Sequence, residues 1–421
     1  MHPTPQAARR VTRLWLLSLT LASVAASADW PWFRGPGQEG MAADGERVRA
    51  WSDAPPTVVW RQPIGAGYSS VSVVGDRLFT MDADGEKEYV VCFGRQRGET
   101  IWRIEAGDFV QAELGDGGPR STPSVADGIV YAVTSQAEVV ALAVADGSRI
   151  WRKDLGEMGP APRFGYASSP VVDGEAIILE VGDKDSSPGI VALDRRSGDV
   201  LWSSLEGPAG YSSALIAELG GQRQYVLFRR AGQEAVALST SGEVLWRFPT
   251  PEALAAIVMP ILVPPDRIFI STSDDSFGGH LIRIVRREGV LRAEEVWSQR
   301  LMRNHFNTSV PVGDYLYGFD NGTLRCLDLA TGEGLWARRG FGKGSLVAAD
   351  GYLFVLSDAG LVAQVRARPD AFEELGRIQV TEGRSWTAPS LAGGRLYVRD
   401  FDELVSLEVG AGVTTGEQEA P

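Results

Sequence analysis

The sequence predicts an all-β fold, an eight-bladed β-propeller built from four-stranded antiparallel blades. Three observations predict it. A tryptophan that follows an aliphatic residue recurs at intervals of 39 to 51 residues, a tight turn between two β-rich runs accompanies each recurrence, and the two ends of the chain carry complementary fragments of one repeat. Repeats of about 20 to 50 residues indicate an architecture in which each unit buries its apolar face against its neighbours.

The recurring tryptophans mark one outer strand per repeat. The clearest copies run from Ala192 to Trp202 and from Cys326 to Trp336, and both predict a strand, a glycine turn and a second strand. One large aromatic side chain per blade can pack on the neighbouring blade, so we interpret these tryptophans as framework and not as binding residues. They are Trp60, Trp102, Trp151, Trp202, Trp246, Trp297 and Trp336.

A second signal marks the hairpin between the first and second strand of each repeat. Dipeptides rich in glycine and aspartate supply the positive φ angles that two-residue hairpins require. They are Gly75-Asp76, Asp127-Gly128, Asp173-Gly174, Gly220-Gly221, Gly313-Asp314, Asp350-Gly351 and Gly393-Gly394, and Pro265-Asp266 serves the fifth repeat. Eight hairpins therefore stand beside seven tryptophan strands, and residues 377–380 occupy the position of an eighth outer strand.

The two ends of the repeat region predict how the ring closes. The chain begins with an outer strand around Trp60, before any hairpin, and ends with three strands over residues 389–409 that lack an outer one. Pairing the two fragments completes one blade and removes the free sheet edges that an open ring would expose. We therefore expect a propeller over residues 57–409, preceded by a segment at 29–56 and followed by a flexible tail at 410–421.

The N-terminus indicates export. Arg9, Arg10 and Arg13 precede an apolar run over residues 14–24, which ends in Ala26-Ser27-Ala28. The run is shorter than the about 20 residues that span a bilayer, and the small residues fit a signal-peptidase site. We expect a signal peptide cleaved after Ala28 and a secreted or periplasmic protein of the bacterial cell envelope. A retained anchor is the alternative, and no later segment predicts a transmembrane span.

Composition limits the partners. The chain has 44% hydrophobic and 23% charged residues, as expected of a large globular protein. Its net charge is −13, and because the first 28 residues carry three arginines and no acid, the remainder carries −16. This charge disfavours nucleic acid and anionic membranes as partners. Cys92 and Cys326 each lie ten residues before a tryptophan in blades that are not neighbours, so we expect two buried free thiols.

The repeats resemble those of the pyrroloquinoline quinone (PQQ)-like β-propellers, a superfamily that includes BamB-like and quinoprotein alcohol dehydrogenase-like proteins. Its blades carry an Ala-x-Asp-x-x-Thr-Gly-x-x-x-Trp signature, which Ala192 to Trp202 reproduces with Ser for Thr and Cys326 to Trp336 with Cys for Ala. The opening Trp30-Pro31-Trp32-Phe33-Arg34-Gly35-Pro36 is similar to the leader of exported PQQ-like repeat proteins. The resemblance covers nearly the whole mature chain.

The resemblance implies either of two functions. Quinoprotein dehydrogenases of the superfamily carry adjacent cysteines, a Glu, Asn and Asp set around calcium and, in some, a Cys-x-x-Cys-His haem segment, and this chain has neither adjacent cysteines nor the haem motif. We therefore expect a binding or protein-interaction scaffold without catalysis. A PQQ-dependent oxidoreductase is the alternative, and PQQ with calcium is an unsupported cofactor.

Metal chemistry has little support in the sequence. The mature chain has only His280 and His305, which cannot build a histidine and cysteine cluster. Asp82-Ala83-Asp84-Gly85 and Asp183-Lys184-Asp185 hint at calcium, but neither continues into a twelve-residue loop that ends in glutamate. We interpret both as hairpin or solvated loops and expect no metal site and no catalytic residues.

One ring of candidate ligand-binding residues emerges when the blades are aligned on their hairpins. The residue seven before each turn enters an innermost strand from the loop between blades, which places it at the mouth of the axial channel. Cations and aromatic rings there suit a small anionic or planar ligand. Channel packing, and an envelope protein partner bound at the blade edges of a monomer, are the alternatives. The aligned positions are Tyr68, Arg120, Tyr166, Tyr211, Val258, Phe306, Lys343 and Trp386, and Arg163, Phe164, Asn304, His305 and Arg384 lie nearby. Among these, the candidate ligand-binding residues are Tyr68, Arg120, Arg163, Tyr166, Tyr211, His305, Lys343, Arg384 and Trp386.

Overall fold

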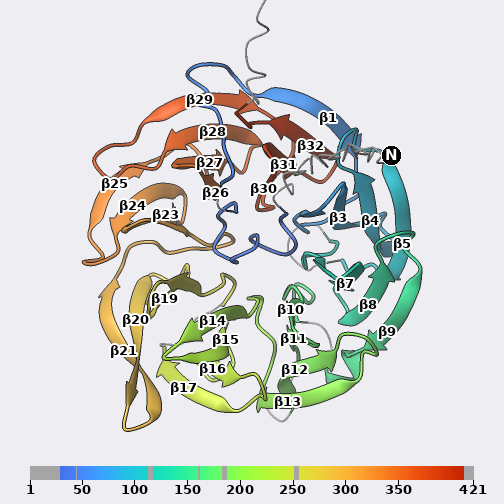
Figure 1. Cartoon of the computed structure of the whole chain (residues 1–421), viewed down its shortest axis with the longest axis vertical. Helices are drawn as coiled ribbons and strands as arrows, with labels where there is room; N and C mark the ends of the chain where they lie inside the picture. The colour runs from blue at the N-terminus through green and yellow to red at the C-terminus, as the bar shows by residue number, and fades with distance from the viewer. Residues whose placement is uncertain are drawn as a thin grey trace, which may run out of the picture.

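A computed structural model of the chain describes residues 29–43, 45–111, 117–159, 162–182, 187–250 and 256–411. Within these residues, 32 strands form eight separate four-stranded antiparallel sheets arranged as a ring (Figure 1). The predicted eight-bladed β-propeller is confirmed. The predicted signal peptide, Asp183 and Asp185, and most of the predicted tail lie outside the described residues.

The first four blades follow one another along the chain, and in each the strands run in order from the innermost to the outermost. Blade one contains β2 (Ser72–Val74), β3 (Arg77–Ala83), β4 (Lys87–Gly94) and β5 (Thr100–Asp108). Blade two contains β6 (Ser124–Ala126), β7 (Ile129–Val133), β8 (Glu138–Ala143) and β9 (Arg149–Asp154), and a short 3-10 helix η1 (Gly156–Met158) follows it. Blade three contains β10 (Val171–Asp173), β11 (Ala176–Glu180), β12 (Pro188–Asp194) and β13 (Val200–Glu206). Blade four contains β14 (Leu215–Leu219), β15 (Gln222–Arg229), β16 (Glu234–Ser239) and β17 (Val244–Pro249).

The last four blades complete the ring. Blade five contains β18 (Ile261–Val263), β19 (Arg267–Ser271), β20 (Gly279–Arg287) and β21 (Val290–Gln299). Blade six contains β22 (Val310–Val312), β23 (Tyr315–Asp320), β24 (Thr323–Asp328) and β25 (Gly334–Arg338). Blade seven contains β26 (Ser345–Ala349), β27 (Tyr352–Leu356), β28 (Leu361–Arg366) and β29 (Glu374–Gln379). Blade eight contains β30 (Ser390–Ala392), β31 (Arg395–Arg399), β32 (Glu403–Glu408) and β1 (Thr57–Pro63).

Blade eight closes the ring as predicted. Strand β1, from the start of the repeat region, pairs antiparallel with β32, and the register runs from Thr57 opposite Glu408 to Pro63 opposite Glu403. Of the predicted hairpin turns, that of blade three is displaced by one residue, because Asp173 still pairs with Ala176 and leaves Gly174 and Glu175 in the turn.

The signature tryptophans join neighbouring blades. The indole nitrogen of Trp151 in β9 donates a hydrogen bond to the carbonyl of Arg195 in blade three, at 3.0 Å. Gly198, in the following turn of blade three, packs against the same indole, and a Cβ at this position would lie only 2.8 Å from the ring. Trp202 and Gly242 repeat this arrangement between blades three and four. The glycine turn and the tryptophan of the repeat signature are therefore the two halves of one contact between blades.

The apolar cores lie between blades. One core unites Phe79, Cys92 and Trp102 of blade one with Val130 and Leu142 of blade two. Both cysteines are buried and unpaired, as predicted, and burial raises the pKa of each thiol to about 12.

Residues 29–43, which we call the leader, cross the middle of the ring (Figure 1). Trp30 pairs with Val73 of the innermost strand β2. The buried Arg34 guanidinium donates to the carbonyls of Thr308 at 3.0 Å and Ser309 at 2.7 Å, just before β22. The leader therefore fills the channel by binding the inner edges of several blades. It also forms hydrogen bonds with Gly75, Val125, Ala214, Ile216 and Ala348.

Among the residues that the structure describes, no helix has the length and apolar character that crossing a membrane requires.

Candidate functional site

The loops that precede the innermost strands bring aromatic rings from three blades into one continuous stack. The rings of Tyr68 and Trp386 stack at 6.3 Å between centroids, and Trp386 contacts Phe306 at 4.6 Å. His305 stacks on Phe306 at 3.9 Å. Tyr68 precedes β2, Phe306 precedes β22 and Trp386 precedes β30, so the stack joins blades one, six and eight across the channel.

Cationic side chains lie over these rings. The guanidinium carbon of Arg120 lies 4.6 Å from the centroid of Tyr68, and that of Arg384 lies 4.6 Å from the centroid of Trp386. The Lys343 ammonium lies 5.2 Å from the Phe306 centroid. Cations in such positions are attracted by the negative face of the ring. We call this set the mouth cluster: Tyr68, Arg120, His305, Phe306, Lys343, Arg384 and Trp386.

His305 lies against Lys343. The Lys343 Nζ lies 2.7 Å from Nδ1 of the imidazole. Burial and, to a smaller extent, the neighbouring ammonium lower the pKa of His305 to about 4. The imidazole is therefore neutral at neutral pH, and its Nδ1 accepts a hydrogen bond from the ammonium.

The other predicted residues lie apart from the mouth cluster. Arg163 lies 5.5 Å from the ring of Phe164, which contacts Tyr211 at 5.8 Å, so these three form a second, smaller group. Tyr166 is 2% exposed and belongs to the apolar core that blades two and three share. Val258 and Asn304 are likewise buried. Of the nine candidate residues, six therefore belong to the mouth cluster, two belong to the smaller group and one lies in the core.

A cavity of about 390 Å³ lies beside the mouth cluster. Phe401, in the turn after β31, lines it and contacts the edge of Tyr68 at 4.8 Å. Arg384 lines the same cavity. Sequence reasoning missed Phe401, because it lies in a turn between the second and third strands and the alignment considered only the loops that precede the first.

Of the two aspartate motifs that hint at calcium, the structure describes Asp82-Ala83-Asp84-Gly85. Asp82 forms an ion pair with Arg103 at 3.0 Å, and Asp84 accepts hydrogen bonds from the backbone of Glu86 and Lys87 within its own hairpin. Among the described residues there is no group of three or more histidine, cysteine, aspartate or glutamate side chains able to hold a metal ion.

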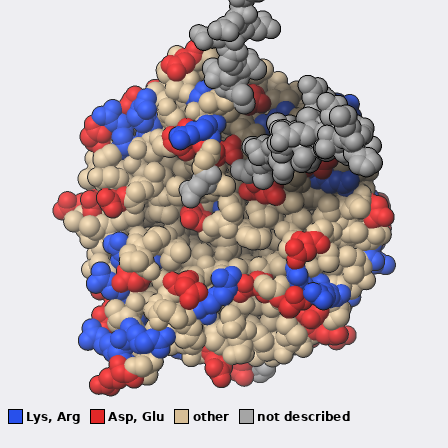
Figure 2. Space-filling model, in the orientation of Figure 1, with Lys and Arg blue, Asp and Glu red and all other residues tan. Residues whose placement is uncertain are grey.

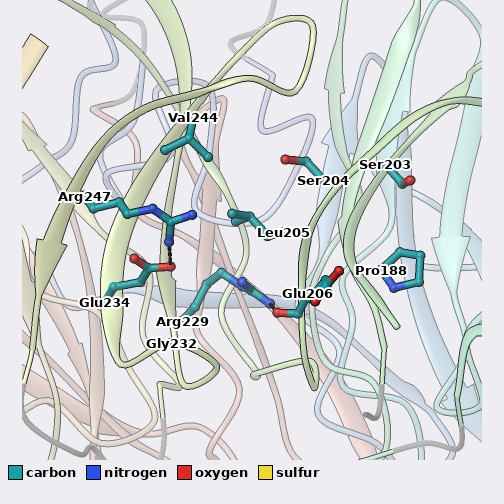
Figure 3. Close-up of a pocket in the computed structure, with 10 residues that line it drawn as sticks. All are labelled: Pro188, Ser203, Ser204, Leu205, Glu206, Arg229, Gly232, Glu234, Val244 and Arg247. Atoms are coloured by element: carbon teal, nitrogen blue, oxygen red, sulfur yellow. Dashed lines mark hydrogen bonds and ion pairs between the residues drawn. The ribbon is translucent and has the colours of Figure 1, made fainter. Parts of the chain in front are cut away.

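A larger cavity, of about 620 Å³, lies between the outer strands of blades three and four (Figure 3). We call it the rim groove. Its floor holds the Arg229 and Glu180 ion pair, 3.2 Å between Nε and Oε1, with both side chains 2% exposed. On one wall Arg247 pairs with Glu234. The sequence carried no signal for this groove, because its residues occupy ordinary strand positions.

Comparison with known proteins places the chain among a group of bacterial proteins. The sequence profile of the family described as outer membrane protein assembly factor BamB matches residues 43–204 and 184–336. The BamB protein of Shewanella oneidensis is 25% identical over 322 residues, covering 72% of this chain and 76% of that protein. The BamB protein of Burkholderia pseudomallei is 25% identical over 360 residues, covering 82% and 85%.

Solved structures show the same fold. BamB from Moraxella catarrhalis superposes with a TM-score of 0.60 at 16% identity, covering 84% of this chain and 97% of that one. The quinohemoprotein alcohol dehydrogenase of Comamonas testosteroni superposes with a TM-score of 0.67 at 13% identity, covering 94% and 82%. At these identities the likeness establishes the architecture, and function depends on the residues of each site.

Proposed function

The chain belongs to the family of outer membrane protein assembly factor BamB, and from this premise we propose that it is a non-catalytic binding scaffold for proteins of the cell envelope. The relatives that match over most of the chain are named as assembly factors. One structural observation carries the proposal: the chain's own leader and mouth cluster occupy the axial channel, which leaves the loops and the outer rim as the surfaces for a partner.

Export belongs to the same proposal. A signal peptide cleaved after Ala28 delivers the mature chain to the periplasm, where envelope partners are found. Mass spectrometry of the mature N-terminus tests the cleavage position, and a first residue other than Asp29 contradicts it.

The scaffold proposal is tested by affinity purification of the tagged full-length protein from solubilised envelopes of its own organism. We expect a stoichiometric envelope protein that is absent when an unrelated exported propeller carries the tag. Purified protein should also show no heat of binding with PQQ and Ca²⁺ and no dye-linked alcohol oxidation. Quinone binding with turnover and without any protein partner supports the oxidoreductase alternative instead.

The mouth cluster favours a second candidate function, the binding of a small planar anion. Rings and cations from blades one, two, six, seven and eight meet there beside a cavity. Quenching of tryptophan fluorescence by a panel of aromatic carboxylates provides the readout, and the part of the quenching that Trp386→Phe removes belongs to this site. Replacing Arg120 and Lys343 together with alanine should abolish quenching while the melting temperature barely moves. An unfolded double variant identifies these residues as channel packing.

A further inference from the structure

The rim groove has the features of a binding site on the outside of the ring. Ser203, Ser204 and Leu205 of β13 form one wall, and Val244 and Arg247 of β17 form the other. In Figure 3 the Arg247 guanidinium points across the groove toward Leu205 of the opposite wall. The groove thus offers apolar contact from Leu205 and Val244 and hydrogen-bonding groups from both walls.

The backbone around the groove is specialised. Leu205 has a φ of 56°, a left-handed conformation that is uncommon for a bulky residue, and such residues cluster at binding sites. The floor depends on Gly189, because a Cβ there would lie 2.3 Å from the Arg229 guanidinium. The sequence therefore keeps a buried ion pair and an open groove at this boundary between blades.

Exposed apolar side chains lie on the outer strands of this part of the ring. Among the described residues, nine large apolar side chains are exposed, and five of them lie on β13, β17 and β21, the outer strands of three consecutive blades. The five are Val200, Leu201, Val244, Val290 and Val296. Of these, Val244 lines the groove itself and offers apolar contact to a partner there.

Two arginines that have no carboxylate partner among the described residues lie on the hairpin next to the groove, although the protein is acidic overall. The hairpin formed by β20 and β21 packs against β17 and extends beyond the ring (Figure 1), and basic side chains gather on this side of the molecule (Figure 2). Arg286 bonds only to carbonyl and amide oxygens, and Arg292 has no hydrogen-bond or ion-pair partner among the described residues. In the groove itself, Arg247 bonds to Glu234 through Nη1 and not through its other two guanidinium nitrogens. These guanidinium groups favour carboxylates.

The outer strands also offer a free edge. In each blade the outermost strand is hydrogen-bonded on one side only, so β13 presents unpaired backbone groups on the other, whereas β21 packs against β17. A strand of six or seven residues is about 20 Å long, which an extended peptide can follow while its side chains alternate between the groove and solvent.

We propose that the rim groove and the adjacent β20–β21 hairpin bind an extended segment of a partner protein in which aliphatic and acidic side chains alternate. Aliphatic side chains enter the groove between Leu205 and Val244, and carboxylates meet Arg247 and the arginines of the hairpin. The inference rests on the proposed scaffold function, since it assumes a protein partner. An anionic lipid surface is disfavoured by the charge of −13 on the chain, which repels it.

A display library of random twelve-residue peptides, selected on the mature protein, tests the proposal. We expect enriched sequences to alternate aliphatic and acidic residues. Val244→Trp fills the groove and should weaken their binding at least tenfold by fluorescence anisotropy. Thr100→Trp places the same side chain at the equivalent position of blade one, two residues before the tryptophan, and should leave affinity unchanged. If Val244→Trp does not fold, Ser203→Trp fills the groove from the opposite wall.

The contribution of charge is tested separately. Arg286→Glu with Arg292→Glu should weaken binding of the selected peptide at least fivefold and reduce its dependence on salt. Arg97→Glu with Arg196→Glu, on exposed turns of blades one and three, serves as the matched control and should have no effect.

Four outcomes overturn the proposal: no enrichment, enriched sequences without acidic residues, full binding to both groove-filling variants, or hairpin-dependent binding to phosphatidylglycerol vesicles. Recovery of an envelope partner by affinity purification together with a negative peptide selection leaves the scaffold function standing and removes only the groove. Failure of both experiments removes the scaffold function as well.

Discussion

At the scale of single residues, the repeated pairing of an indole with a glycine explains why the sequence was so informative. Trp151 and Gly198, or Trp202 and Gly242, meet across a blade boundary, and each pair needs both residue types at a fixed spacing. A contact that demands specific residue types leaves a visible pattern. Tyr166 shows the limit of such patterns. The alignment of the blades predicted its position along the chain, but it could not predict that its ring is buried in the core.

The glycine contact predicts a difference between two Gly→Ala substitutions. Gly198 and Gly174 both have positive φ, but a Cβ at Gly198 meets Trp151 at 2.8 Å whereas one at Gly174 meets nothing within 4 Å. Gly198→Ala should therefore cost about 1 to 3 kcal/mol more unfolding free energy than Gly174→Ala. Urea denaturation of the two variants measures this, and equal losses contradict the contact between blades.

His305 predicts a pH dependence. Because its pKa is lowered to about 4 in the folded protein, the unfolded chain binds the proton first as the pH falls below the ordinary value of 6.5. The contribution of this group to stability is therefore lost between pH 6.5 and about 4, and it is constant above and below that window. NMR titration of the imidazole should give a midpoint near 4. Lys343→Met should raise the midpoint, Lys343→Arg should keep it low, and a wild-type midpoint near 6.5 contradicts the assignment.

The cysteines predict an inert native state. Burial raises the pKa of Cys92 and Cys326 to about 12, and only the thiolate attacks disulfide reagents. Neither thiol should react with Ellman's reagent at pH 8 in the native protein, and two equivalents should react after denaturation without reductant. A disulfide between them in a peptide map contradicts their placement in blades one and six.

At the scale of elements, the number and order of strands could be predicted, whereas the detail of their boundaries could not. Each blade repeats its turns and its tryptophan, so eight sheets followed from the spacing. The turn of blade three lies one residue later than predicted, because Asp173 pairs with Ala176, and the Asp173 carboxylate binds Arg223 and Tyr225 of blade four, a contact that no local pattern predicts. The rim groove depends on the backbone of Leu205, which is equally invisible in sequence.

Closure by β1 predicts a steep loss of stability on its removal. A chain that starts at residue 57 lacks the leader, and a chain that starts at residue 64 lacks β1 as well. The second should melt at a markedly lower temperature than the first and should associate through the exposed edge of β32. Calorimetry and light scattering compare the two. Identical melting temperatures and monomeric behaviour mean that the ring closes without this strand.

At the scale of the whole molecule, the leader joins blades that are not neighbours in the ring. Its course could not be predicted, because Arg34 and Gln38 bind backbone carbonyls, which every segment of the chain possesses. The family resemblance identified residues 30–36 as a motif, but it did not predict that they cross the channel. What the sequence predicted was the ring, and what it could not predict was the use of the channel.

The leader predicts a strong effect of one arginine. Arg34→Ala removes three hydrogen bonds from a buried guanidinium and leaves the carbonyls of Thr308 and Ser309 without that donor. Since an unsatisfied buried group costs about 1 to 3 kcal/mol, the loss of unfolding free energy should exceed about 2 kcal/mol. Arg47→Ala removes an ion pair of a side chain that is 74% exposed and should cost less than about 0.5 kcal/mol. Chemical denaturation distinguishes them, and similar losses show that the leader is loosely held.

The same leader sets a sequence of events in biogenesis. Synthesis proceeds from the N-terminus, so residues 29–43 emerge first, yet Arg34 bonds to a carbonyl 275 residues further along the chain. The bonds that the leader makes to the sixth and seventh blades can therefore form only after those blades have been synthesised. A chain interrupted before that point lacks the carbonyls of Thr308 and Ser309, so its Arg34 has no partner in the sixth blade.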